Sequence, residues 1–205
     1  MYKGEKFNSI SHLLGVVLAF IGATALLTIA INKGDIWRIV GFSIYGFMLI
    51  LLYSVSTIYH SVKGRLKDIF RQLDYISIYL MIAGSYTPFT LISLRGVWGW
   101  SLFGAVWGLA LIGIIQEVIL GKKTRKYSLI IYPLMGWIIV LAINPLMESL
   151  STAGFWWLAA GGLAYTFGIV FFLLDEKIRH FHGVWHLCVL AGSICQFICL
   201  FKYVV

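Results

Sequence analysis

Seven long apolar stretches, separated by short polar segments, constrain the fold of this chain more than any other feature. A membrane core is about 30 Å thick and takes about 20 helical residues to cross. Backbone groups inside lipid must satisfy their own hydrogen bonds, so such stretches form helices. The predicted spans are residues 10–31, 36–60, 72–93, 97–120, 127–147, 154–174 and 182–203. We therefore predict an all-α membrane protein, a bundle of seven transmembrane helices forming one domain over residues 1–205.

The composition supports a membrane protein. Only 12% of the residues are charged and 60% are hydrophobic, whereas a soluble domain carries about 25% charged residues. The first stretch lies where a secretory signal peptide would lie, but its apolar run is long and lacks a clear small-residue cleavage site. We expect it to remain as the first helix. Whatever the protein does is therefore predicted to happen within the membrane or at its edge.

The basic residues predict the orientation. Of the 16 Lys and Arg residues, only Lys33, Arg38, Arg95 and Lys202 fall at one set of helix ends, and the remaining twelve fall at the other. Short loops rich in Lys and Arg stay in the cytoplasm. The N-terminus is therefore predicted inside and the C-terminus outside a cell membrane, which we expect to be a bacterial plasma membrane. This bias explains the net charge of +8 through topology and anionic lipid headgroups, so we expect no nucleic acid partner.

Three histidines are predicted to lie at one depth near the cytoplasmic helix ends. His182 and His186 are four residues apart, so both imidazoles point from one face of the last helix. His60 ends the second span, which runs inward and stops where the last span begins. Ionisable groups inside spans usually face the bundle interior or a wet cavity. The pattern fits a metal site, and it also fits a hydrogen-bonded helix-packing cluster without metal.

Two further residues extend this pattern. Asp74 begins the third span at the same depth, and Ser56 lies one helical turn before His60. Three neutral imidazoles and an exchangeable water form a common catalytic Zn²⁺ shell. In such a site Asp74 fits as a proton acceptor for the water, and Ser56 as a hydrogen-bond donor beside it.

Other polar positions allow two interpretations each. Glu5, Asn8 and His12 share one face at the start of the first helix, where they either cap the site or anchor the helix at the headgroups. Ser193 and Gln196 extend the face of the histidine pair toward the membrane centre. This stripe indicates either a polar cavity above the ion or hydrogen bonds between helices.

Three more features have ordinary structural interpretations. Cys188, Cys195 and Cys199 lie nearly opposite the histidine pair on the last helix, and we interpret them as small buried hydrophobic residues. Gly104 and Gly108 form a small-xxx-small pair, which favours close helix packing inside the bundle over a dimer contact. Glu117 is expected to pair with the basic loop 122–126.

Taken together, the motifs resemble the hemolysin III family, the bacterial branch of a group that includes the adiponectin and progestin receptors. Alkaline ceramidases are similar more distantly. The resemblance runs along essentially the whole chain. Its motifs are Glu5-x-x-Asn8-x-x-x-His12, Ser56-x-x-x-His60, Leu73-Asp74-Tyr75, Gly84-Ser85-Tyr86-Thr87-Pro88 and His182-x-x-x-His186.

The resemblance implies a seven-helix bundle with a cytoplasmic N-terminus and a zinc ion held by the histidines of the second and seventh spans. Those positions match His60, His182 and His186, and Asp74 and Ser56 match positions tied to the zinc water.

Three functions remain at this point. The first is a zinc-dependent, ceramidase-like hydrolase of lipid amides or esters that serves membrane lipid homeostasis, with membrane lipids as substrates. The second is a non-catalytic, receptor-like sensor or regulator of membrane state. The third is a pore-forming cytolysin, ranked last because no span carries a charged residue in the interior of its outer half. The substrate and the oligomeric state are not predicted.

Overall fold

The computed structural model describes residues 4–121 and 125–205, and within these ranges it contains seven helices long and apolar enough to cross a membrane. No strand occurs among the described residues. The helices are α1 (Lys6–Lys33), α2 (Ile36–Tyr59), α3 (Arg65–Pro88), α4 (Val97–Leu120), α5 (Arg125–Trp137), α6 (Ile143–Ser149), α7 (Thr152–Leu174) and α8 (Phe181–Cys199). A π-helical turn, Phe89–Ser93, continues α3, and another, Leu200–Val204, continues α8. The predicted all-α membrane fold is confirmed.

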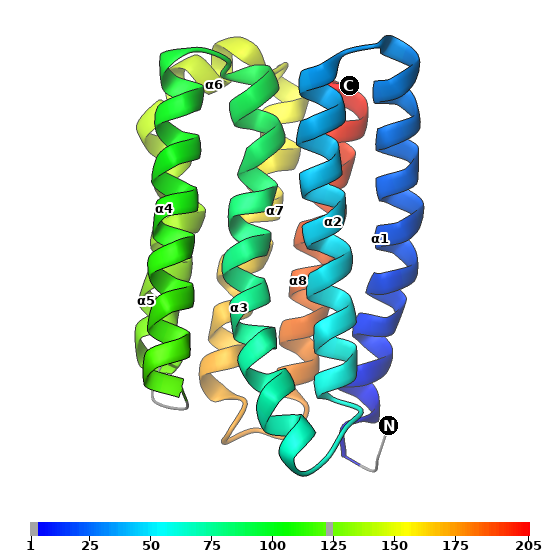
Figure 1. Ribbon diagram of the computed structural model, residues 1–205, viewed down its shortest axis with the longest axis vertical. Helices are drawn as coiled ribbons and strands as arrows, with labels where there is room; N and C mark the ends of the chain where they lie inside the picture. Colours follow the sequence, from blue (N-terminus) through cyan, green and yellow to red (C-terminus); the bar gives the residue numbers. More distant parts are fainter. Residues whose placement is uncertain (1–3, 122–124) are drawn as a thin grey trace.

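The helices run side by side along the long axis of the molecule, and the two termini lie at opposite ends (Figure 1). Each of α1 to α4 packs on the next, and α8 packs on both α7 and α1, which closes the bundle. Large apolar side chains such as Ile21, Phe47 and Phe167 are exposed on its outer surface. Such a surface is suited to lipid rather than water. The inside–outside orientation stays a prediction.

The structure extends the third span toward the basic end of the bundle. Helix α3 begins at Arg65 rather than at the predicted residue 72. Its first two turns carry Lys67, Asp68 and Arg71, which lower the hydropathy but are compatible with a helix in water or among headgroups. Hydropathy therefore locates the membrane-embedded part of this helix and misses its polar extension.

The fifth span is interrupted, which the sequence analysis missed. Helix α5 contains Pro133 and ends at Trp137, a 3₁₀ segment follows over Ile138–Ala142, and α6 completes the span. Tyr86 of α3 supports this interruption, because its hydroxyl donates to the Gly136 carbonyl at 2.7 Å and accepts from the Ile139 amide at 3.2 Å. Within lipid such freed backbone groups need a protein partner.

Removing this hydroxyl is expected to destabilise the bundle. In Tyr86→Phe, the two backbone groups lose their partner, at a cost of about 1–3 kcal/mol. Thermal unfolding of the purified protein measures the loss. The matched control is Tyr127→Phe, whose phenol is 53% exposed and should unfold like the parent. Equal stability of the two variants would contradict this role for Tyr86.

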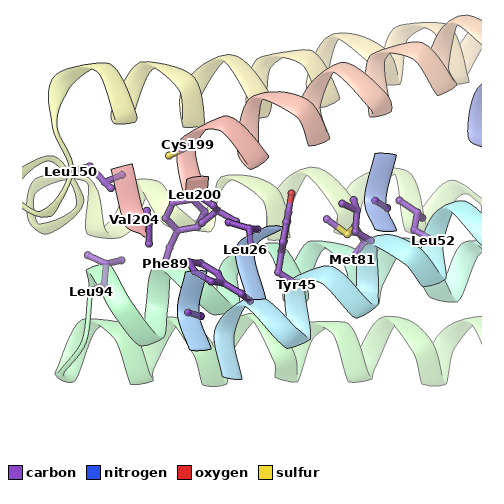
Figure 2. Close-up of a cluster of buried hydrophobic side chains, with 14 of the residues drawn as sticks. Leu26, Tyr45, Leu52, Met81, Phe89, Leu94, Leu150, Cys199, Leu200 and Val204 are labelled. Atoms are coloured by element: carbon purple, nitrogen blue, oxygen red, sulfur yellow. The ribbon is translucent and has the colours of Figure 1, made fainter. Parts of the chain in front are cut away.

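The half of the bundle near the C-terminus is filled by apolar side chains. Leu26, Tyr45, Phe89, Leu200 and Val204 come from α1, α2 and the two π-helical turns, and all are buried in one cluster (Figure 2). A packed cluster of this kind excludes water. The polar residues of interest lie in the other half, where α1, α2, α3 and α8 approach the N-terminal end.

The structure bears on two expectations for α4. Gly104 and Gly108 are exposed, and a Cβ atom at either position would meet nothing within 4 Å. The prediction that they mediate packing inside the bundle is therefore wrong; they lie on the outer surface. Glu117 is buried, with Oε1 lying 3.4 Å from Arg71 Nη2 of α3. Its expected partners at 122–126 have side chains outside the described residues.

Candidate metal centre

Three histidines from two distant parts of the chain meet at the N-terminal end of the bundle. His60 follows the last turn of α2, and His182 and His186 lie on the first turns of α8. Each ring offers one nitrogen, and these three atoms all lie within 4.8 Å of one another. His60 is 2% exposed and His186 is 1% exposed. The predicted histidines are therefore brought together, and the group can hold a metal ion.

The outward-facing nitrogens of the rings have acceptor partners. His60 Nδ1 lies 2.7 Å from Glu5 Oε2, and His182 Nδ1 lies 2.6 Å from Asp175 Oδ2. A carboxylate only accepts hydrogen bonds, so both Nδ1 atoms carry the proton. In a neutral imidazole the other nitrogen, Nε2, is then an acceptor with a free lone pair.

The two acceptor nitrogens face each other. His60 Nε2 and His182 Nε2 are 3.2 Å apart, which is close to the ~3.3 Å that two ligands of a tetrahedral zinc with 2.0–2.1 Å bonds would show. Without a cation between them, two lone pairs at this distance repel. The tautomers and the spacing therefore fit a shared metal ion.

His186 follows the same pattern through its neighbour α1. Its Nδ1 lies 3.1 Å from the Asn8 carbonyl and 3.2 Å from Ser11 Oγ. Because the Ser11 hydroxyl donates to the Asn8 carbonyl at 2.9 Å, it is free to accept from His186. Each ring is thus oriented by a group outside the cluster, as is usual for metal-bound histidine.

Glu5 connects the N-terminal segment to the three-histidine cluster. Its carboxylate accepts hydrogen bonds from His60 and Asn8 and from Lys67 Nζ at 2.7 Å. Burial raises the pKa of Glu5, but the hydrogen bonds from His60, Lys67 and Asn8 outweigh burial and hold the pKa well below its usual value. Burial also lowers the pKa of His60 below its usual value, although the hydrogen bond to Glu5 acts in the opposite direction. At neutral pH the pair is therefore a carboxylate beside a neutral imidazole.

Removing the Glu5 carboxylate should weaken metal binding without removing a ligand. In Glu5→Ala, His60 loses the acceptor that fixes its tautomer, and the affinity for Zn²⁺ is expected to fall by about 10–100-fold. Competition titration against a chromophoric chelator measures this change. Glu148→Ala is the matched control, because Glu148 is exposed and belongs to α6, which lies at the opposite end of the bundle (Figure 1). Unchanged affinity in Glu5→Ala would contradict the orienting role.

Asp74 and Ser56 form a pair beside the histidines. Ser56 is buried one turn before His60, and its hydroxyl faces the half-buried Asp74 side chain, which also lies close enough to His182 to interact with it electrostatically. Both residues line the same cavity as the three histidines. The structure thus places these two predicted residues next to the three histidines, on the same cavity.

The face carrying Glu5, Asn8 and His12 points to the site rather than to headgroups. His12 is buried, and its ring stacks on His186 with centroids 3.6 Å apart. Neither ring nitrogen of His12 has a hydrogen-bond partner among the described residues. Of the two interpretations left open by the sequence, the structure favours the one in which this face covers the site.

Several contributors to the site were not predicted. Asp175, Ser11 and Lys67 hold the histidines or Glu5, but each comes from a segment whose position depends on tertiary packing. Gly183, a glycine between the two histidines of α8, was a weak sequence signal that another helix approaches this face closely. A Cβ there would lie 2.1 Å from the Phe7 ring, so the glycine permits α1 to approach α8. The cysteines of α8 do not belong to the site, because they face α7. Cys199 Sγ, for example, donates to the Gly154 carbonyl of α7.

A cavity of about 460 Å³ begins at the three histidines and extends into the bundle. Beyond the polar end its walls are mainly apolar, with Leu52, Ile78, Ile82, Ile169 and Val189 among the lining residues. This volume lies in the range of small-molecule sites.

The cavity also reaches the lipid-facing surface between α5 and α7. Gly136 and Trp137 line it from α5 and are exposed, and Thr166 lines it from α7. The Trp137 indole donates to Thr166 Oγ1 at 2.9 Å across this boundary. The cavity is therefore lined at this boundary by residues that also lie on the outer surface of the bundle.

Comparison with known proteins identifies the family. The sequence matches the family model described as Haemolysin-III related over residues 1–197. The chain belongs to the haemolysin III family. This confirms the resemblance that the motifs indicated, and with the seven apolar helices it makes the protein a multi-pass integral membrane protein.

Relatives in the haemolysin III family cover nearly the whole chain. Hemolysin-3 of Bacillus cereus is 42% identical over 203 residues, which are 98% of this chain and 92% of that protein. The Hemolysin-3 homolog of Bacillus subtilis is 41% identical over 204 residues, 99% of this chain and 95% of that one. Human Monocyte to macrophage differentiation factor is 30% identical over 202 residues, 96% of this chain and 82% of that protein. The bacterial relatives indicate the plasma membrane, and their name does not establish cytolysis by this chain.

Proposed function

We propose that this protein is a zinc-dependent hydrolase that cleaves amide or ester bonds of membrane lipids. The observation that carries the proposal is the position of the three-histidine cluster and the Asp74–Ser56 pair at the polar end of a mainly apolar cavity. Reactive groups and a space for a lipid chain are thus joined in one site.

The donor set suits zinc. His60, His182 and His186 would hold the ion through Nε2, Nε2 and a ring nitrogen of His186, and three imidazoles leave one position of a tetrahedral shell for water or substrate. Zinc in such a site polarises a carbonyl and makes water a nucleophile near neutral pH. The carboxylates of Glu5 and Asp175 keep the rings in the tautomer that binds metal.

Asp74 would move the proton in this reaction. Its carboxylate lines the cavity beside His182, where it can accept a proton from the attacking water and return it to the leaving nitrogen or oxygen. The Ser56 hydroxyl would donate to this carboxylate and hold it in one orientation. These two roles would be the same for every lipid substrate.

The lipid would enter sideways. An acyl chain already in the bilayer can pass between α5 and α7, where Gly136 and Trp137 bring the cavity to the surface. The carbonyl would lie at the histidines and the chain along the apolar wall. Membrane lipids are accordingly the proposed partners, and the basic loops supply headgroup contacts rather than a nucleic acid site.

A hydrolysis assay with metal removal tests the proposal. The protein in lipid nanodiscs is incubated with a panel of N-acyl sphingoid lipids and glycerophospholipids, and released fatty acid is measured by mass spectrometry. We expect release from at least one class, loss of release after treatment with a zinc chelator, and recovery on adding Zn²⁺. Hydrolysis that continues unchanged in the chelated protein would contradict a zinc-dependent reaction, and no release from any lipid would contradict the hydrolase.

A regulatory function is the second candidate. The centre joins residues of α2 and α8 and the segment before α1, so an ion there would tie three parts of the bundle together. If this were its role, deleting the gene would change membrane fluidity or lipid composition, while the purified protein would release no fatty acid. The packed apolar half of the bundle offers no observation in favour of a pore.

A further inference from the structure

The far end of the cavity contains a carboxamide whose oxygen has no hydrogen-bond partner among the described residues. Gln196 of α8 is 9% exposed, and its Oε1 is buried and makes no hydrogen bond to any described residue. A buried polar group usually has a partner, because leaving it unpaired in an apolar environment is costly. Gln196 lines both the main cavity and an adjoining one of about 100 Å³.

Its neighbour on the same helix face shows the contrast. Ser193, one turn earlier, receives a hydrogen bond from Tyr53 at 2.8 Å and shares another with Tyr165 at 2.8 Å. Of the two interpretations of this polar stripe, hydrogen bonding between helices therefore accounts for Ser193. It does not account for Gln196, which stands at the cavity.

A second hydrogen-bonding group faces the same junction. Ser85 of α3 is buried and lines both cavities with Gln196. Its hydroxyl proton is used, because Oγ donates to the Ile82 carbonyl at 2.8 Å, while its lone pairs can still accept. The junction thus offers acceptors at Gln196 and Ser85 within a mainly apolar space. A group that donates a hydrogen bond would satisfy it.

The distance to the metal centre limits which lipid atom can reach this junction. Gln196 follows His186 by ten residues, which is ~15 Å along an α-helix. An extended hydrocarbon chain with bonds of ~1.5 Å covers this length with ~12 carbons. A chain whose carbonyl lies at the histidines would therefore bring the middle of a long acyl chain to Gln196.

We propose that Gln196 and Ser85 form a subsite for a hydroxyl group near the middle of a lipid acyl chain. The proposal rests on the proposed function, since it places an acyl chain in the cavity with its carbonyl at the histidines. A hydroxyl has one proton, which it can donate to Gln196 Oε1 or to Ser85 Oγ, and its own oxygen can accept from the carboxamide nitrogen. The subsite would make the protein selective for hydroxylated chains over plain ones.

Competition binding tests this selectivity. The full chain in phosphatidylcholine nanodiscs is loaded with a fluorescent fatty acid, which is displaced by stearate or by 2-, 12- or 18-hydroxystearate. The parent protein is expected to bind 12-hydroxystearate about tenfold more tightly than stearate, the effect of one buried neutral hydrogen bond. The 2- and 18-hydroxy isomers should show no such preference, because their hydroxyls lie far from Gln196.

Two leucine variants separate the subsite from general effects of burying an amide. Gln196→Leu should bind stearate at least as well as the parent and lose the preference for 12-hydroxystearate. Gln116→Leu is the matched control, because Gln116 also has a buried, unpartnered amide nitrogen but does not line the cavity. It should keep the preference. Thermal unfolding of both variants verifies that they are folded.

The outcomes separate this proposal from the hydrolase. If the parent binds fatty acids but prefers no hydroxyl position, or if Gln196→Leu keeps the preference, the subsite is wrong while the hydrolase stands. Water held by Gln196 would give that first result. If no fatty acid is displaced by any competitor and no lipid is hydrolysed, the acyl-chain cavity itself is wrong and both proposals fall.

Discussion

The His186→Ala protein is expected to bind no zinc at the concentration that saturates the parent and to release no fatty acid. The imidazole is one of the three proposed ligands, and without it only two histidine ligands remain. Loss of an orienting partner alone lowers metal affinity by about 10–100-fold, and loss of a ligand should exceed this. Zinc titration and the lipid assay measure the two effects on one preparation.

A second histidine serves as the control. His180 is exposed in the loop before α8 with a φ of 71°, so His180→Asn removes an imidazole and keeps a residue that tolerates this backbone conformation. This variant should bind zinc and hydrolyse lipid like the parent. His60→Ala repeats the test from α2 should His186→Ala fold poorly. Zinc bound at parental affinity in a folded His186→Ala protein would remove this residue from the site.

Asp74→Asn, in contrast to His186→Ala, is expected to retain zinc while losing hydrolysis. Asn has nearly the shape of Asp but cannot accept the proton of the attacking water, and loss of a general base typically costs 10²–10⁴-fold in rate. Ser56 can still donate to the Asn carbonyl oxygen, so the local structure should persist. The rate of fatty acid release and the zinc content are measured together.

The control lies on the same helix. Asp68 is an exposed carboxylate in the first turn of α3, away from the cavity. Asp68→Asn should therefore keep the parental rate. If Asp74→Asn kept full activity on every lipid that the parent cleaves, Asp74 would have no part in proton transfer and the mechanism would need another base.

Hydropathy and residue spacing predicted the framework of this protein. Seven apolar stretches can hardly fold otherwise in a membrane, and the helical repeat alone places His182 and His186 on one face. The proximity of His60 to this pair was predicted because the second span runs inward and ends at the depth where the last span begins. These predictions succeeded because they depend on local periodicity and on the fixed thickness of a bilayer.

Other features depend on tertiary packing and were not predictable in this way. The contact between Glu5 and His60 joins residues 55 positions apart, and no local pattern specifies it. The 3₁₀ segment Ile138–Ala142 lies in an apolar run that reads as a continuous helix, and only Tyr86 from α3 shows how its backbone is satisfied. Gly104 and Gly108 were placed on the wrong face of α4. The helix carries apolar residues around its whole circumference, so the sequence does not reveal which face points outward.

X-ray absorption at the zinc edge of the purified parent protein tests the central claim most directly. We expect about one zinc per chain, with three imidazole nitrogens and one oxygen ligand at 2.0–2.1 Å and no sulfur ligand at 2.3 Å. Such a spectrum would place the ion at His60, His182 and His186 rather than at the cysteines of α8. A protein purified with no zinc that also fails to bind added Zn²⁺, or a spectrum with sulfur ligands, would contradict the account.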